Sequence, residues 1–333
     1  MNKYQICDFS KTYAREPVLA IMPDGSLVCI LTTGGPTEPH NENYTMICRS
    51  EDGGKTWSEP QLLFDNEKRG VWVTELFTKG EYPMMVVHTY NAEVPYKELQ
   101  TFVSYTYDNG KTWTDPVSMA PHSTGFSIRK GFTLSNGDYF FPVYFTRIDS
   151  NFGVYKDWQD KDYWKGSYHS CAALISSDKG KTYTPYGLFE KNLWEPNAVE
   201  LEDGHILMFM RDSNKPFMNI AESFDYGRTW EHKGNTSMPN ANAKIDVAKV
   251  AGKVVLTSNL KESLPFDERA NLVIQISDNN CKTWREPIPV TTPDDHIFYP
   301  HSAVDYHKKI FYLAYENARQ FYINVYTFDE LGL

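Results

Sequence analysis

An eight-residue pattern, Ser-x-Asp-x-Gly-x-Thr-Trp, recurs five times in this chain of 333 residues and constrains its fold more than any other feature. The copies occupy residues 50–57, 106–113, 176–183, 223–230 and 277–284. The Asp carboxylate can accept hydrogen bonds from the backbone N–H groups just ahead of it and so close a turn. The Gly supplies a positive φ angle. Each copy therefore predicts a tight turn whose aromatic residue returns into a sheet.

The fifth copy departs from the pattern at two positions. Asn279 replaces the Asp and can still accept hydrogen bonds, but Cys281 stands where the other copies have Gly. Because a residue with a Cβ atom is disfavoured at positive φ, we expect this turn to be distorted or strained.

The spacing of the copies indicates the architecture. The third positions are residues 52, 108, 178, 225 and 279, so successive copies lie 56, 70, 47 and 54 residues apart. A repeat of about 50 residues with short strands is typical of a β-propeller. We predict an all-β fold, one six-bladed propeller spanning residues 1–333 with four-stranded antiparallel blades. The sixth unit lacks the motif, and residues 4–8 would give it a strand that closes the ring.

This motif is the Asp-box, and the chain resembles the sialidase (neuraminidase) superfamily over nearly its whole length. The resemblance implies a six-bladed propeller with the boxes on the outer edges of the blades, away from the active site. It also implies an active site at the mouth of the central channel, near the start of each innermost strand. An insertion at residues 149–166 is expected at the rim of a binding face.

Composition narrows the partners. The formal net charge is −10, which argues against nucleic acid, and aromatic residues make up 15% of the chain, which suits a glycan or oligosaccharide substrate. The five Cys residues are scattered without metal-ligand spacing, so we expect mostly buried thiols and no cofactor, with a structural Ca²⁺ left open. No signal peptide or membrane span is evident, which predicts a cytoplasmic protein or one whose signal peptide was removed. The oligomeric state stays open.

The resemblance supplies three arginines for a carboxylate. Arg15, in Arg-Glu-Pro, matches the R-x-P motif that opens sialidases, and Arg211 and Arg269 match the other two members of the family's triad. Three converging guanidinium groups make a strong carboxylate site. Glu195 lies 16 residues before Arg211, as the family's catalytic Glu does, which fits two short strands joined by a turn.

Tyr299 opens the last unit where the family places its nucleophile. Sialidases depart from the two-carboxylate scheme of glycosidases because a Tyr attacks the anomeric carbon. A phenol needs a base and nearby cations for this role. The resemblance implies Glu195 as that base, and His301 is a competing inward-facing candidate beside Tyr299.

The first unit departs from the family. The general-acid Asp of the family has no counterpart in residues 34–44 of this chain, where His40 falls nearest to the expected position. A His can serve as acid or base near neutral pH, and Glu38 or Glu42 could substitute. Arg129 and Asp246 are further candidates for contacts with the substrate, since each lies near the start of an inner strand.

These residues predict a sialidase-like exo-glycosidase that hydrolyses a terminal acidic sugar, of the sialic acid or uronic acid type, from glycans. One alternative is a polysaccharide lyase on uronic-acid glycans, in which His40 or Tyr299 removes the α-proton. Another is a glycan-binding propeller without catalysis. An unsaturated uronate product would identify the lyase, and binding without turnover would identify the binding protein.

Overall fold

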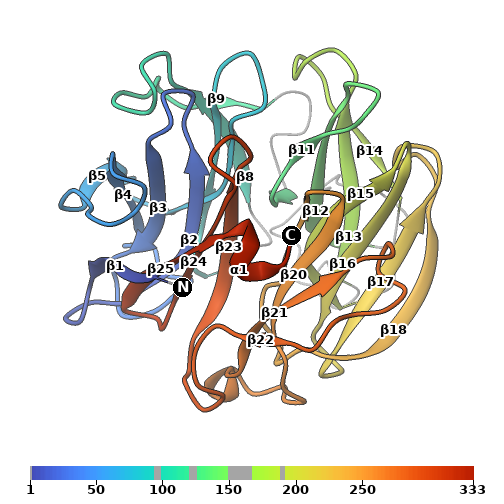
Figure 1. Cartoon of the computed structure of the whole chain (residues 1–333). Coiled ribbons are helices and arrows are strands. Elements are labelled where there is room, and N and C mark those ends of the chain that lie inside the picture. Colours follow the sequence, from blue (N-terminus) through green and yellow to red (C-terminus); the bar gives the residue numbers. More distant parts are fainter. Residues whose placement is uncertain (1, 94–98, 120–125, 149–166, 188–191) are drawn as a thin grey trace.

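The described residues form six antiparallel sheets around one axis, a six-bladed β-propeller (Figure 1). A computed structural model describes residues 2–93, 99–119, 126–148, 167–187 and 192–333. The predicted rim insertion at residues 149–166 lies outside them. In the described part of the chain, no helix has the length and apolar character to span a bilayer.

Five blades follow the chain in order, each starting at the axis. The first contains β2 (Ala14–Ile21), β3 (Leu27–Thr33), β4 (Tyr44–Ser50) and β5 (Gln61–Phe64), and the second contains β6 (Gly70–Phe77), β7 (Met84–Tyr90), β8 (Gln100–Tyr105) and β9 (Val117–Ser118). The third contains β10 (Phe126–Ile128), β11 (Phe132–Thr133), β12 (Tyr139–Ile148), β13 (Ser167–Ser176) and β14 (Thr184–Tyr186). The fourth contains β15 (Leu193–Glu202), β16 (His205–Asp212), β17 (Phe217–Ser223) and β18 (Glu231–Pro239), and the fifth contains β19 (Asp246–Val250), β20 (Lys253–Asn259), β21 (Leu272–Ser277) and β22 (Ile288–Pro289).

The sixth blade joins the two ends of the chain. It contains β23 (Phe298–Asp305), β24 (Ile310–Glu316) and β25 (Gln320–Thr327), and β1 (Asn2–Asp8) pairs with β25 as its outer strand. The predicted closure by the N-terminal strand is therefore confirmed. The short helix α1 (Phe328–Leu331) follows β25, and the 3₁₀ helix η2 (Phe266–Glu268) lies between β20 and β21.

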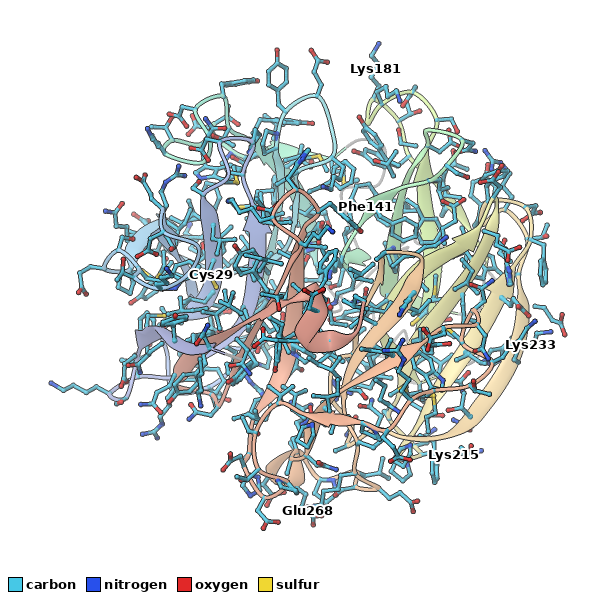
Figure 2. All side chains as sticks on the ribbon, in the orientation of Figure 1. Cys29, Phe141, Lys181, Lys215, Lys233 and Glu268 are labelled. Carbon is cyan, nitrogen blue, oxygen red and sulfur yellow. The ribbon has the colours of Figure 1, made fainter. Side chains whose placement is uncertain are left out.

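Apolar side chains fill the space between neighbouring blades. Phe141 of the third blade packs against Phe77 of the second, with ring centroids 5.0 Å apart, and against Tyr183 at 6.0 Å. Figure 2 shows Phe141 and Cys29 in the interior, while Lys181 and Lys233 reach outward. Four of the five Cys thiols are buried, as predicted, and all five are free.

The Asp-boxes form the predicted turns. Asp52 Oδ1 accepts from the backbone N–H groups of Lys55 and Thr56, both at 3.0 Å, and Gly54 has φ of 86°. In this copy, hydrogen bonds from the Thr56 backbone and hydroxyl lower the pKa of Asp52 to about 2. In the fifth copy Cys281 is held at φ of 65°, so the predicted strained turn is confirmed.

The fourth box gives a stability prediction. Asp225 accepts from Thr229 N at 2.8 Å and from Thr229 Oγ1 at 2.6 Å, so Asp225→Ala should lower the free energy of unfolding by about 1–2 kcal/mol. Asp225→Asn should cost less, because Asn279 already makes both contacts in the fifth copy, to Thr283 N and Thr283 Oγ1. Urea unfolding of the two variants measures this difference, and equal losses would contradict the hydrogen-bond account.

Candidate active site

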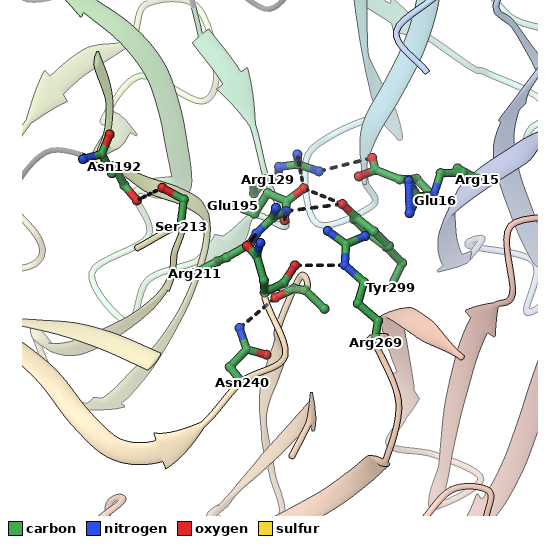
Figure 3. A network of polar contacts seen from close by, with 12 residues as sticks. Arg15, Glu16, Arg129, Asn192, Glu195, Arg211, Ser213, Asn240, Arg269 and Tyr299 are labelled. Carbon is green, nitrogen blue, oxygen red and sulfur yellow. Dashed lines mark hydrogen bonds and ion pairs between the residues drawn. The ribbon is translucent and has the colours of Figure 1, made fainter. Parts of the chain in front are cut away.

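Three inner strands share a backbone distortion at the same end of the channel. Glu16 of β2, Glu195 of β15 and Tyr299 of β23 each precede a Pro, and their φ angles are 56°, 42° and 55°. The pairing register shifts around each of them, between Arg15 and Val18, Trp194 and Asn197, and Phe298 and His301. Such bulges bend a strand and redirect a side chain, and non-Gly residues at positive φ tend to cluster at functional sites. Figure 3 shows these three side chains within one polar network.

The centre of that network is a phenol–carboxylate pair. Tyr299 Oη donates to Glu195 Oε1 at 3.0 Å. Arg211 Nη1 donates to Glu195 Oε2 at 2.7 Å and lies 3.5 Å from Tyr299 Oη. Asn242 Oδ1 holds the other side of this guanidinium by accepting from Arg211 Nε at 2.6 Å. The base, nucleophile and second arginine of the sequence prediction thus lie in mutual contact.

The other two predicted arginines flank Tyr299. The guanidinium carbons of Arg15 and Arg269 lie 5.0 and 5.1 Å from the centroid of its ring. Arg269 Nε donates to Asn242 O at 2.9 Å, while its Nη1 is buried and has no hydrogen-bond partner among the described residues. Burying a guanidinium N–H without a partner is costly, so Arg269 has an unused donor for a ligand.

The surrounding charges and burial lower the pKa of Glu195 and raise that of Tyr299. Burial raises the pKa of Glu195, but the guanidinium groups of Arg211, Arg129 and Arg269 outweigh burial and bring it to about 2. Burial and the adjacent Glu195 raise the pKa of Tyr299 to about 12, against the opposing effect of the arginines. At neutral pH the site therefore holds a neutral phenol that donates to an ionised carboxylate.

Arg129, a predicted contact residue, lies beside this pair together with Glu16, which was not predicted. Arg129 Nη2 lies 3.4 Å from Glu195 Oε1, and its Nη1 lies 3.3 Å from Glu16 Oε2. Trp72 Nε1 donates to the same Glu16 oxygen at 2.6 Å. The position of Glu16, before a Pro at the start of an inner strand as for Glu195 and Tyr299, was a signal that could have identified it.

Comparison with known proteins identifies the family. The family model described as "BNR repeat-like domain" matches residues 25–311. The chain belongs to this family. A sialidase of Bacteroides fragilis is 25% identical to this BNR-repeat propeller over 72% of the chain and 47% of that protein. Together the repeats, fold and relatives place the chain in the sialidase superfamily.

Solved structures share the fold. A Hadza microbial sialidase superposes with a TM-score of 0.74 at 17% identity, covering 95% of this chain and 66% of that one. A Dyadobacter fermentans protein of unknown function superposes with a TM-score of 0.73 at 17% identity, covering 98% and 97%. This BNR-repeat propeller spans about half the length of the curated relatives that it matches.

Two predicted contact residues of this BNR-repeat propeller lie further along the channel. Asp246 accepts from Lys130 Nζ at 2.8 Å and from Ser302 Oγ at 2.5 Å. Lys130, Ser302 and His301 line a cavity of about 380 Å³, whose wall also includes the later residues of β2, β15 and β19. Tyr306, which follows the last residue of β23, also lines this cavity, so the cavity extends toward the channel end opposite to Tyr299. The structure thus places Asp246 in contact with Lys130 and Ser302, which line the same cavity as His301, and the roles of Asp246 and His301 as substrate contacts stay predictions.

The loop at residues 34–44, which lacks the family's Asp, contains two candidates for the general acid, His40 and Glu38, in different surroundings. His40 Nδ1 accepts from Glu42 N at 3.2 Å and lies 3.7 Å from Glu42 Oε2, so this imidazole is engaged within its own loop. Burial of Tyr13 raises the pKa of its phenol, and the negative charge of Glu38 raises it further. Glu38 therefore lies close to the site. Tyr13 Oη in turn accepts from Arg15 Nη1 at 3.0 Å.

Two further groups beside the arginines were not predicted. Glu316 is fully buried, and its Oε1 lies 3.5 Å from Arg15 Nε, which fixes that arginine from behind. Burial raises the pKa of Glu316 to about 7, although Arg15 opposes this shift. Phe266 of η2 is 63% exposed and stacks over Arg269, with the guanidinium carbon 4.6 Å from the ring centroid.

Proposed function

We propose that this protein is a sialidase-like exo-glycosidase that hydrolyses a terminal acidic sugar, of the sialic acid or uronic acid type, from a glycan. The observation that carries the proposal is the 3.0 Å contact between Tyr299 Oη and Glu195 Oε1, surrounded by three guanidinium groups. The relatives named sialidases support the same reaction class.

The arginines bind the carboxylate of the sugar. Arg15, Arg211 and Arg269 come from three different blades, and Arg269 Nη1 has no partner in the part of the chain that the structure describes. Guanidinium groups suit a carboxylate because their N–H groups donate in a planar fork. This clamp fixes the sugar with its anomeric carbon beside the phenol, which lowers the entropy cost of the attack.

Tyr299 is the nucleophile and Glu195 its base. In the free site the low pKa of Glu195, about 2, makes it a poor acceptor for the phenol proton. When a carboxylate binds the arginines, its negative charge offsets theirs, so the pKa of Glu195 rises and this carboxylate becomes a better proton acceptor. Attack by the phenolate forms a glycosyl–tyrosine bond as the glycosidic oxygen leaves, and water then cleaves that bond.

A side chain of the 34–44 loop protonates the leaving oxygen. Glu38 is the better candidate because its charge acts on the Tyr13 phenol, whereas His40 is hydrogen-bonded within its loop. We expect Glu38→Gln to lower kcat about 100-fold on a substrate with a poor leaving group. On an aryl glycoside that needs no protonation, the loss should be small. His40→Ala is the matched comparison, and the opposite ranking of the two variants would assign the acid to His40.

The proposed function is tested by product analysis in ¹⁸O-labelled water. The protein is incubated with a panel of sialylated and uronate-containing oligosaccharides, and products are read by mass spectrometry. Release of a terminal acidic sugar carrying one ¹⁸O per cleavage supports the proposal and names the substrate. Unsaturated products without added water would indicate a lyase, and binding without turnover across the panel would indicate a glycan-binding propeller.

A further inference from the structure

Beside the phenol–carboxylate pair, a second carboxylate shares a guanidinium with the proposed base. Arg129 places Nη1 3.3 Å from Glu16 Oε2 and Nη2 3.4 Å from Glu195 Oε1, so one fork spans two carboxylates (Figure 3). Its guanidinium carbon lies 4.8 Å from the ring centroid of Trp72 and 5.1 Å from that of Tyr144. These contacts hold the cation in one place.

Both partners are out of reach of solvent. Glu16 is 3% exposed and Arg129 2% exposed. A buried charge needs a partner, and removal of one partner leaves the other uncompensated. Burial opposes the charged form of Arg129, but Glu16 is the first of the groups that outweigh burial and raise the pKa of Arg129 above its ordinary value. Glu16 is thus its main counter-charge.

The geometry has a consequence for proton transfer. When the phenol proton moves from Tyr299 to Glu195, negative charge leaves the carboxylate that Arg129 touches and appears on the phenol oxygen. Arg129 therefore opposes the transfer, because it stabilises the charge on Glu195. The negative charge of Glu16 offsets the positive charge of Arg129. Glu16 therefore favours the transfer, although it does not touch Glu195 or Tyr299.

We propose that Glu16 and Arg129 are positioning residues for the Glu195–Tyr299 pair: Arg129 orients the base, and Glu16 offsets the positive charge of Arg129, which would otherwise make Glu195 a weaker proton acceptor. This inference rests on the proposed function for its kinetic part. Glu16 occupies the same position before Pro as Glu195 and Tyr299 on their strands, and Gln in its place keeps an acceptor for Arg129 and Trp72.

Other charged and titratable groups also face the pair. They are the guanidinium groups of Arg15, Arg211 and Arg269, the ammonium of Lys244, the phenols of Tyr13 and Tyr144 and the thiol of Cys171. None of these groups changes in variants at Glu16 or Arg129. A difference between such variants therefore reports on the Glu16–Arg129 pair.

The test titrates the phenol directly and needs no turnover. 3-Fluorotyrosine is incorporated at position 299 and its ¹⁹F resonance is followed from pH 7 to 12 in otherwise unchanged protein, Glu16→Gln and Arg129→Gln. Ionisation of the phenol to solvent leaves Glu195 charged, so this titration measures the potential that the Glu16–Arg129 pair sets at the site, and the kinetics report on the transfer itself. Loss of the Glu16 charge should lower the phenol pKa by about half a unit or more, and loss of the Arg129 charge should raise it by a similar amount. Shifts of opposite sign distinguish an electrostatic role from a general loosening of the site.

Glu75→Gln is the matched control. Glu75 is an equally buried carboxyl on β6 that lines the cavity at the other end of the channel, and burial raises its pKa to about 8. This variant should leave the ¹⁹F titration unchanged. An unmoved or raised Tyr299 pKa in Glu16→Gln, or shifts of the same sign in both test variants, would overturn the proposal. If Glu16→Gln does not fold, the direction of the shift in Arg129→Gln tests the role of Arg129 by itself.

Kinetics give a second readout. Glu16→Gln should lower kcat about tenfold with KM unchanged, since Glu16 contacts Arg129, the partner of the base Glu195, and not the sugar. A rise in KM with kcat unchanged would contradict a role in proton transfer. If the unmodified protein turns over no acidic sugar while the ¹⁹F shifts appear as expected, the proposed function fails and the electrostatic inference stands.

Discussion

Tyr299→Phe is expected to lower kcat at least about 1000-fold while leaving the binding of an acidic sugar nearly intact. The variant removes the oxygen that attacks the anomeric carbon and leaves the ring between Arg15 and Arg269, whose guanidinium carbons lie 5.0 and 5.1 Å from its centroid. Because the phenyl ring keeps this packing, the carboxylate clamp stays in place. Initial rates with the released sugar as product, and calorimetric titration with the same sugar, measure the two quantities.

Tyr306→Phe serves as the control for the loss of a phenol. Tyr306 lies at the opposite end of the channel, where its hydroxyl donates to Lys249 O at 2.6 Å. Its removal should leave kcat unchanged. Retention of more than about a tenth of the activity in Tyr299→Phe would mean that another group, or water itself, makes the attack.

Arg269→Gln is expected to raise KM about 30-fold with a smaller change in kcat. A hydrogen bond to a charged group contributes about 2 kcal/mol, which corresponds to a factor of about 30 in affinity. Arg269 is the cleanest member of the triad to test, because within the described part of the chain its Nη1 has no partner and its Nε donates only to the backbone of Asn242. Arg211, by contrast, also holds Glu195 at 2.7 Å, so its removal would disturb the base.

Arg228→Gln is the matched arginine control. Arg228, in the fourth Asp-box, has its Nη2 2.8 Å from Asp138 Oδ2. We expect an unchanged KM there. Equal effects of the two substitutions would contradict a specific carboxylate contact at Arg269, and a loss of kcat alone in Arg269→Gln would assign it to the reaction step.

The sequence was sufficient for the fold because the decisive signals were local. Asp52 and its equivalents close turns through hydrogen bonds within five residues, and their spacing counts the blades. The closing strand followed from the missing fourth strand of the last unit. The strained fifth turn followed from Cys281 in a Gly position, which has φ of 65°.

The site was less accessible to sequence reasoning because bulges change the direction of side chains. Tyr299, Glu195 and the three arginines were placed by family resemblance, whereas Glu16 was treated as the variable position of R-x-P. A residue at positive φ before Pro points differently from the regular alternation of a strand, and the pattern alone does not reveal this. Asp246 and His301 stay predictions as substrate contacts: Asp246, which opens β19, contacts Lys130 and Ser302, and His301 lines the same cavity as those two residues.

The most direct measurement is a search for the glycosyl–enzyme bond. The protein is mixed with excess acidic-sugar substrate, quenched in acid within milliseconds, digested with pepsin and analysed by mass spectrometry. The proposed mechanism predicts one peptide that contains Tyr299 and is heavier by the mass of one sugar residue, and no such peptide in Tyr299→Phe. Product formation with the sugar on another side chain, or with no labelled peptide during a pre-steady-state burst, would contradict it.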